Sequence, residues 1–385
     1  MSTHALRREP FRVFFPLAIL IGASGMVPWL LFGRGVTRAW PGTAHAITMT
    51  QSFLVAVAVG FLGTMIPRRT GAAPMSWLEL GLLALGLIAA PVLAHADMLA
   101  GAELAYLGVL LTLAGFVIRR LRARGGGHRA PPPSFVLIPI GLLCGVGGAT
   151  LMLWFLVGGE PIWAYLLGRQ LVQQGLMLAL VMALGPMLTP IITTGAPPRD
   201  LAPGALRRSL LLHAAAGLVL VGSFAIEQWA SVRWGLLVRG TACALVLGAG
   251  GALAWGDKQG LHRVLYRIAV IAVPAGLLAA GLAPLRRVSL VHLTFVSGLS
   301  LMVFAVSLHV TLLHTGRERD AERSPWPVAL VALATIAAAL VRASIDLFPA
   351  QYFGALTLAS GLWMFALLAW AAYVVPKLLV RTRRR

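Results

Sequence analysis

Residues 45–66, HAITMTQSFLVAVAVGFLGTMI, form a long and mostly apolar run that is followed by Pro67 and the basic pair Arg68 and Arg69. At a helical rise of about 1.5 Å per residue, a run of about 20 residues crosses the roughly 30 Å hydrocarbon core of a bilayer. The only ionisable side chain in the run is His45, at its start. The run therefore predicts a transmembrane helix.

Apolar runs of this kind recur along the whole chain. Of its 385 residues, 59% are hydrophobic and 11% are charged, and the mean hydropathy is +0.85. A soluble domain with so few charges could not cover its surface with polar groups, whereas a chain surrounded by lipid needs no such surface. The composition excludes a soluble globular protein and predicts an all-α, polytopic membrane helical bundle.

We count about twelve spans between charged or Pro- and Gly-rich breaks. They cover residues 13–33, 45–66, 76–94, 100–118, 135–157, 163–192, 209–229, 234–255, 264–284, 290–313, 326–348 and 352–376. With the N-terminus placed inside, most of the 32 Lys and Arg residues fall on the inner side, and the outer side receives only Arg34, Arg38, Arg233, Arg286 and Arg287. Because cytoplasmic loops are enriched in Lys and Arg, both termini are predicted to be cytoplasmic.

The net charge of +20 would indicate a nucleic-acid partner in a soluble protein. Here it follows from the membrane topology, so we expect no nucleic acid. The longest polar connection, residues 119–133 (RRLRARGGGHRAPPP), predicts a flexible basic cytoplasmic loop. Since no connection is long enough for a soluble domain, residues 1–385 are expected to form a single integral membrane domain.

Ionisable side chains inside spans are costly and indicate either a packed pair or a functional site. In the second span, His45, Thr48, Met49 and Ser52 share one helical face. An imidazole followed by a thioether one turn later suits copper or heme iron. The alternative is an interfacial histidine accompanied by Ser and Thr residues that pack helices together.

The tenth span contains His292, His309 and His314. His292 and His314 lie on similar faces but at opposite ends of the span, about 33 Å apart at the helical rise, so they cannot bind one metal together. His309 faces away from the other two. In the predicted topology His292 and His45 both open their spans from the outer side, so these two can form an axial pair for heme iron.

Two arginines are predicted at a similar depth and could pair with the propionates of a heme. Arg169 lies on the sixth span with Gln173 one turn deeper, and Arg342 lies on the eleventh span four residues before Asp346. The alternatives are that Arg342 and Asp346 form an ion pair on their own helix, and that Arg169 extends to the membrane interface.

Four segments resemble the NnrS family of bacterial membrane proteins. They are EPFRVFFPLA (residues 9–18), HAITMTQSFLVAVAVGFLGTMIPRRTG (45–71), GRQLVQQGLMLALVMALGPML (168–188) and VHLTFVSGLSLMVFAVSLHVTLLHTGR (291–317). The most specific feature is His292 followed 22 residues later by the motif HTGR, which starts at His314. Together the segments extend over most of the chain.

The resemblance implies a twelve-span protein of the bacterial inner membrane that contains heme and copper. It also implies a link to nitric oxide metabolism, to protection against nitrosative stress and often to denitrification. The expected partners are the lipid bilayer, nitric oxide or metal-nitrosyl species, and a respiratory redox partner. The candidate metal ligands are His45, Met49, His292, His309 and His314, and the heme is expected to be b-type because no CxxCH attachment motif is present.

The sequence departs from the family at two places. The family commonly has W-H-x-H-E-M in the second span, whereas residues 44–49 read AHAITM, so that Ile47 replaces the second histidine. This loss weakens any copper site that depended on that histidine. His309 stands where the family often has Arg.

The leading hypothesis is a heme-binding inner-membrane protein of nitric oxide metabolism and, if it turns over, a heme-dependent membrane oxidoreductase that acts on nitric oxide or its adducts. One alternative is a twelve-helix secondary transporter, in which Pro186 and Pro190 would break the sixth span. Another is a metal or heme assembly factor. No electron-carrier domain or nucleotide motif is present, so electrons would come from a partner.

Overall fold

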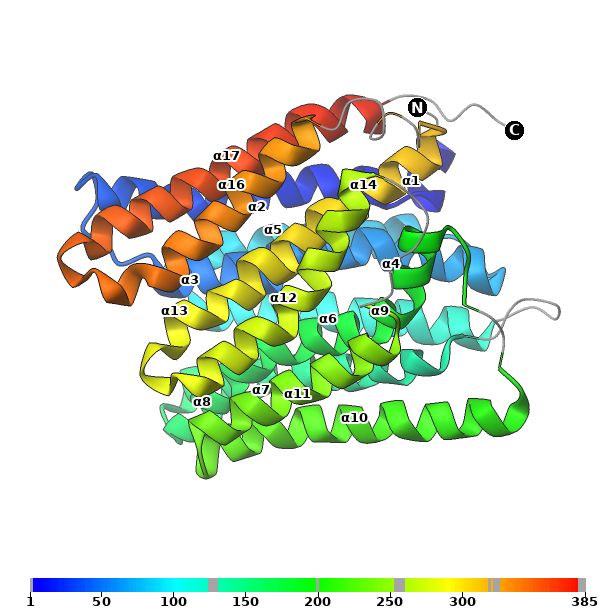
Figure 1. Cartoon of the computed structure of the whole chain (residues 1–385), viewed down its shortest axis with the longest axis horizontal. Helices are drawn as coiled ribbons and strands as arrows, with labels where there is room; N and C mark the ends of the chain where they lie inside the picture. The colour runs from blue at the N-terminus through cyan, green and yellow to red at the C-terminus, as the bar shows by residue number, and fades with distance from the viewer. Residues whose placement is uncertain are drawn as a thin grey trace. The chain divides into compact units, whose positions relative to one another are not determined.

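The computed structural model describes residues 3–123, 131–198, 201–252, 260–317, 320 and 326–379. In these residues the chain is almost entirely helical and has no β-strand (Figure 1). The same residues include twelve helical stretches that are long and apolar enough to cross a membrane. The predicted all-α fold and the predicted number of spans are confirmed, and the chain is a multi-pass membrane protein.

The elements follow one another in chain order. Up to residue 194 they are α1 (Thr3–Arg8), α2 (Phe11–Gly33), α3 (Gly42–Ala46), η1 (Ile47–Phe53), α4 (Leu54–Thr70), α5 (Trp77–His95), α6 (Leu99–Arg122), η2 (Pro133–Val136), α7 (Leu137–Gly158), α8 (Ile162–Gln170), η3 (Leu171–Gly175) and α9 (Leu176–Thr194). The remainder are α10 (Pro203–Trp229), α11 (Val232–Ala249), α12 (Leu261–Leu282), η4 (Pro284–Arg286), α13 (Arg287–His292), η5 (Leu293–Ser300), α14 (Leu301–Thr315), α16 (Trp326–Ser344), η6 (Ile345–Leu347), η7 (Pro349–Gln351) and α17 (Tyr352–Leu378). Of the η elements, η1, η3 and η5 are π-helical and the others are 3₁₀-helical.

The chain divides into two compact units. The first comprises Met1–Pro28, Ala39–Pro132 and Gly141–Met177, and the second comprises Trp29–Arg38, Pro133–Ile140 and Leu178–Arg385. Helices α2, α7 and α9 contribute residues to both units. A single integral membrane domain over residues 1–385 stays a prediction.

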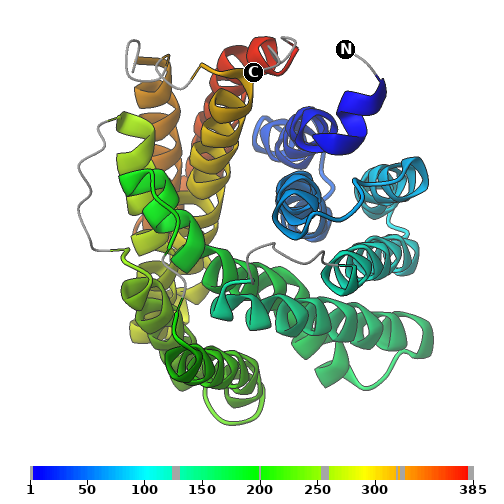
Figure 2. The same cartoon turned by 90° about the vertical axis from the view of Figure 1, so that its right-hand side faces the viewer.

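In the first unit, α5 and α6 are neighbouring antiparallel helices (Figure 2). The helix α5 begins with a capping box: Ser76 Oγ accepts a hydrogen bond from the Glu79 amide at 3.1 Å, and the Glu79 carboxylate accepts one from the Ser76 amide at 2.7 Å. Two amide groups that the helix itself cannot bond are satisfied in this way. The turn between the helices contains Asp97, which has a positive φ of 60°.

The end of α6 corrects the predicted limits of the basic loop. Residues 119–122 belong to α6 and are not part of a flexible segment. Glu79 stabilises this last turn, because its carboxylate lies 2.7 Å from Arg119 Nη2 and 2.6 Å from Arg120 Nη2. Arg120 also lies over the Phe116 ring, with its guanidinium carbon 4.2 Å from the ring centroid. Residues 124–130 of the predicted loop lie outside the described residues.

In the second unit, α10 contacts α11 and α11 contacts α12, while α16 and α17 lie side by side (Figure 1). A charged pair joins α10 to α11 within the predicted spans. Arg239, which is fully buried, donates to Glu227 Oε2 at 2.8 Å and to Ser223 Oγ at 3.1 Å. The carboxylate partner explains why this charged side chain can be buried within a span.

The predicted spans agree with the helices to within a few residues, with two larger differences. The helix α10 begins at Pro203 and not near residue 209, and α11 ends at Ala249 and not near residue 255. The break that the transporter alternative places in the sixth span is absent, because α9 continues through Pro186 and Pro190. The departure from α-helical geometry in that span is the π-helical η3, which lies before both prolines.

An even number of crossings places both termini on the same side of the membrane, and the charge pattern predicts that this side is the cytoplasm. Green fluorescent protein fused after Arg385 should therefore fluoresce, and alkaline phosphatase fused at that position should be inactive. Phosphatase fused after Ser231, between α10 and α11, should be active. The opposite pattern at both fusion points would contradict the predicted orientation.

Candidate functional site

The structure describes three π-helical segments, and each directly follows a site residue predicted from the sequence. The segment η1 (Ile47–Phe53) begins two residues after His45, η3 (Leu171–Gly175) two residues after Arg169, and η5 (Leu293–Ser300) one residue after His292. π-helical turns are rare in proteins and occur frequently at functional sites. The chain therefore departs from α-helical geometry in three of the four spans to which the sequence assigned heme-site residues, while the described span that carries Arg342 contains no π-helical segment.

In the first unit, His45 is oriented by the backbone of α2. Its Nδ1 lies 2.9 Å from the carbonyl oxygen of Gly25. Since a carbonyl can only accept, Nδ1 carries the proton and donates it, and the lone pair of the neutral ring is at Nε2. Histidines that bind metals are commonly oriented in this way, with one ring nitrogen donating to a backbone carbonyl or carboxylate.

The close approach of α2 to η1 depends on Gly25. A Cβ atom at this position would lie 2.8 Å from Met49 Sδ and 3.0 Å from Thr48 Cγ2. His45 and Met49 therefore both lie against the same residue of α2. On the other side, Thr48 Oγ1 is 3.5 Å from Nε2 of His95, the last residue of α5.

Arg169 also belongs to the first unit. The segments η1 and η3 contact each other, so the π-helical turns that follow His45 and Arg169 are neighbours. The Arg169 side chain is exposed, with its guanidinium carbon 5.9 Å from the centroid of the Tyr165 ring.

In the second unit, His292 also bonds to a backbone carbonyl, but to one in the preceding turn of its own helix and not to one in a neighbouring helix. Its Nδ1 lies 2.6 Å from the carbonyl oxygen of Val288, so Nδ1 donates and the lone pair of the neutral ring is again at Nε2. The Phe295 ring packs edge-on at 6.1 Å between centroids. Both predicted axial histidines thus have the tautomer that presents Nε2 to a metal.

Arg342 lies beside the helical turn that carries His292. Its Nη1 donates to Ser289 Oγ at 2.9 Å. Asp346 lies 4.0 Å from Arg286 Nε, and within the described residues no ion pair joins Arg342 to Asp346. The alternative of a self-contained ion pair on α16 is therefore not what the structure has.

Close packing against α12 fixes the position of η5. A Cβ atom on Gly276 would lie 2.5 Å from both the amide nitrogen and Oγ1 of Thr294, and one on Gly298 would lie 2.8 Å from Val273 Cγ2. Thr294 Oγ1 also donates to the Val273 carbonyl at 2.9 Å. The helix α12 thus touches the backbone of η5 two residues after His292.

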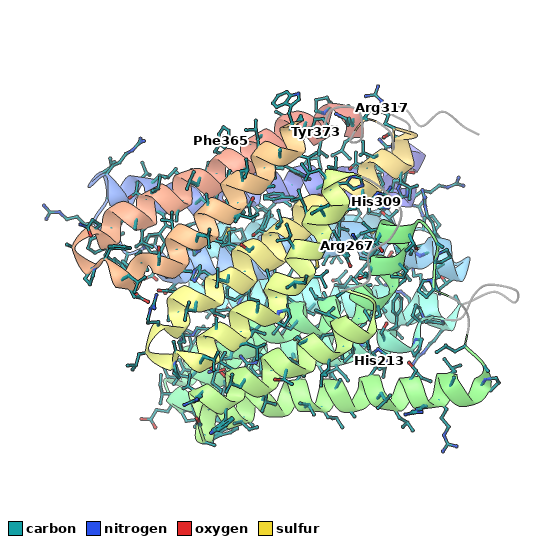
Figure 3. All side chains as sticks on the ribbon, in the orientation of Figure 1. His213, Arg267, His309, Arg317, Phe365 and Tyr373 are labelled. Atoms are coloured by element: carbon teal, nitrogen blue, oxygen red, sulfur yellow. The ribbon has the colours of Figure 1, made fainter. Side chains whose placement is uncertain are left out.

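The two remaining candidate ligands lie at the other end of the span Pro284–Thr315 from His292. The His309 ring stacks on that of the buried His262, with centroids 5.9 Å apart and an interplanar angle of 25°. Nδ1 of His314 lies 2.8 Å from the Val310 carbonyl. Figure 3 shows His309 on α14 and Arg267 on the neighbouring α12.

The structure groups the predicted residues within each unit. The first unit holds His45, Met49 and Arg169, and the second holds His292, Arg342, His309 and His314. The pairing of His45 with His292 on one heme stays a prediction.

The sequence reasoning missed one buried polar pair near His45. Gln51 Nε2 donates to Glu103 Oε1 at 2.9 Å, and both side chains are almost completely buried. Glu103 is the only acidic residue in the span predicted at residues 100–118, and a lone acid in an apolar span was the signal that could have identified it.

The packing of η5 leads to a stability prediction. Gly276→Ala should push Thr294 away from α12 and destabilise the protein by about 1–3 kcal/mol. Gly222→Ala in α10 is the matched control, because an added Cβ there meets no heavy atom of the described structure within 4 Å. Thermal unfolding in detergent measures both variants. Equal stability of the two would contradict the close packing of α12 on η5.

No protein of curated function matches the chain. The model of a protein family described as NnrS protein matches residues 5–383. Since this match covers nearly the whole chain, the protein belongs to the NnrS family of nitric oxide-related membrane proteins.

Proposed function

We propose that this protein binds a b-type heme in the bacterial inner membrane and takes part in nitric oxide metabolism or in the response to nitrosative stress. His45 and His292 are the proposed axial ligands. The observation that carries the proposal is the shared geometry of these two histidines. Each precedes a π-helical segment within a span, and each donates from Nδ1 to a backbone carbonyl, which leaves Nε2 as the ligand nitrogen.

Membership in the NnrS family supports the link to nitric oxide, and the positions of the arginines support the choice of heme. Arg342 donates to Ser289, which lies three residues before His292, and Arg169 is exposed in the turn before η3. Guanidinium groups bind carboxylates through two parallel hydrogen bonds. Arg169 and Arg342 are therefore the residues we propose at the propionate groups.

When bound, the heme would supply a redox-active iron that can react with nitric oxide. The residues that bind the iron would determine which reactions it can take part in. If His45 and His292 both held the iron, the site would suit electron transfer or sensing better than capture of a gas. The chain carries no electron-carrier domain, so electrons for any turnover would come from a respiratory partner.

The residues present do not fit a copper site of the kind that the family motif implies. Ile47, at the position of the second histidine, is buried against Ala94 and Ala102 in an apolar cluster. In the described part of the chain, no three His, Cys, Asp or Glu side chains are grouped so that they could hold a metal ion. We therefore propose heme without copper.

The visible spectrum of the detergent-purified protein, oxidised and reduced with dithionite, tests this function. The wild type, expressed with adequate heme, should show a b-type spectrum. His45→Ala and His292→Ala should each lower the heme content by at least about ten-fold, because metal ligands are more sensitive to mutation than the groups that orient them.

His213→Ala is the matched control and should keep the heme. His213 lies on α10, and its Nδ1 is 2.7 Å from the Ser209 carbonyl, so it has the same local hydrogen bond without a predicted ligand role (Figure 3). Heme retained in both test variants would overturn the ligand assignment and direct attention to His309 and His314. A colourless wild type would favour the transporter alternative.

A further inference from the structure

A cluster of buried polar side chains lies between η1 and α6 in the first unit. It consists of Gln51 and Ser52 on η1 and Glu103 and Tyr106 on α6, and each residue is at most 1% exposed. One hydrogen bond, from Gln51 Nε2 to Glu103 Oε1, joins the two helical elements. Four polar atoms of the cluster have no hydrogen-bond partner in the described structure: Glu103 Oε2, Gln51 Oε1, Ser52 Oγ and Tyr106 OH.

Glu103 differs from the other deeply buried acids of the described structure in the charge of its partner. The side chains of Glu9, Glu79 and Glu227 are at most 9% exposed, and each lies within 2.8 Å of at least one arginine. Glu103 forms no ion pair in the described structure, and the amide that binds it is uncharged. A buried carboxylate without a cation costs several kcal/mol, and protonation removes that cost.

No ion pair joins Glu103 to the surrounding elements in the described structure. Ala44 of α3, the helix that carries His45, packs against the apolar cluster that contains Ala102, and Gly145 of α7 lies against Leu110. The other elements that pack against α6 are η1, α4 and α5. Of these, η1 has no ionisable side chain, and α4 has only Arg68 and Arg69, at the end away from η1. The helix α5 has Glu79 at its start and the exposed His95 at its end. On α6 itself, Tyr106 is the nearest ionisable group, and the arginines are in the last turn.

We propose that Glu103 is a proton-binding site. Its carboxyl group carries a proton at neutral pH, with Oε1 accepting the hydrogen bond of Gln51 and Oε2, which has no partner in the described structure, carrying the proton. Two members of the cluster, Gln51 and Ser52, belong to η1, the π-helical segment that follows His45. A change in the conformation of η1 would therefore change the hydrogen-bond partners of Glu103.

This site is independent of the proposed function, since it needs neither heme nor nitric oxide. Its test is the infrared spectrum of the purified protein at neutral pH in a detergent without ester groups. The wild type should show the carbonyl-stretching band of a protonated carboxyl group, at higher wavenumber than the carboxylate bands, and the band should shift on exchange into D₂O.

The isosteric Glu103→Gln variant should lose this band completely. Glu160→Gln removes an exposed acid and should keep it, which makes it the matched control. Tyr106→Phe should keep the band and shift its position, because a neighbouring hydroxyl is removed. A wild type without the band, or a folded Glu103→Gln variant that retains it, would overturn the proposal. The wild-type spectrum shows whether a protonated carboxyl group is present even if a variant fails to fold.

Discussion

Inside the hydrocarbon core, a backbone amide or carbonyl can form hydrogen bonds only with protein, because no water is present to replace the missing partner. The twelve spans of this chain meet this constraint by being helical throughout, even where prolines interrupt the sequence of α9. The 3₁₀-helical segments lie at the ends of the described spans, whereas the three π-helical segments inside those spans depart from α-helical geometry. Because such turns sacrifice regular α-helical geometry, they are expected where the position of a side chain matters more than local stability. The histidines that precede η1 and η5 are the side chains whose positions matter most to the proposed function.

The same constraint acts on the buried side chains. Arg239 is fully buried and binds Glu227, while Arg120 binds Glu79 at the end of α6. The imidazoles of His45 and His292 bind backbone carbonyls, which settles their tautomers. Glu103 differs from these residues because its hydrogen-bond partner, the amide of Gln51, is uncharged.

The number and approximate limits of the helices could be read from the sequence, because apolar runs of sufficient length have few other structures available to them. The pairing of side chains between helices could not be read from the sequence. Gln51 and Glu103 are 52 positions apart, and Arg120 and Glu79 are 41 apart, so their contacts depend on which helices become neighbours. The α-helical continuation over residues 119–122 follows from the ion pairs with Glu79, whereas local composition favoured a loop. The π-helical geometry of η1, η3 and η5 has no distinct composition, and it was recognised only in the structure.

The central claim of this account is the proposal that His45 and His292 bind a heme iron. Pulsed electron paramagnetic resonance of the oxidised protein, labelled with ¹⁵N only in histidine, counts the imidazole nitrogens bound to that iron. The account predicts a low-spin ferric heme coupled to two histidine nitrogens, which belong to His45 and His292. A heme coupled to only one histidine nitrogen, or to none, would contradict it.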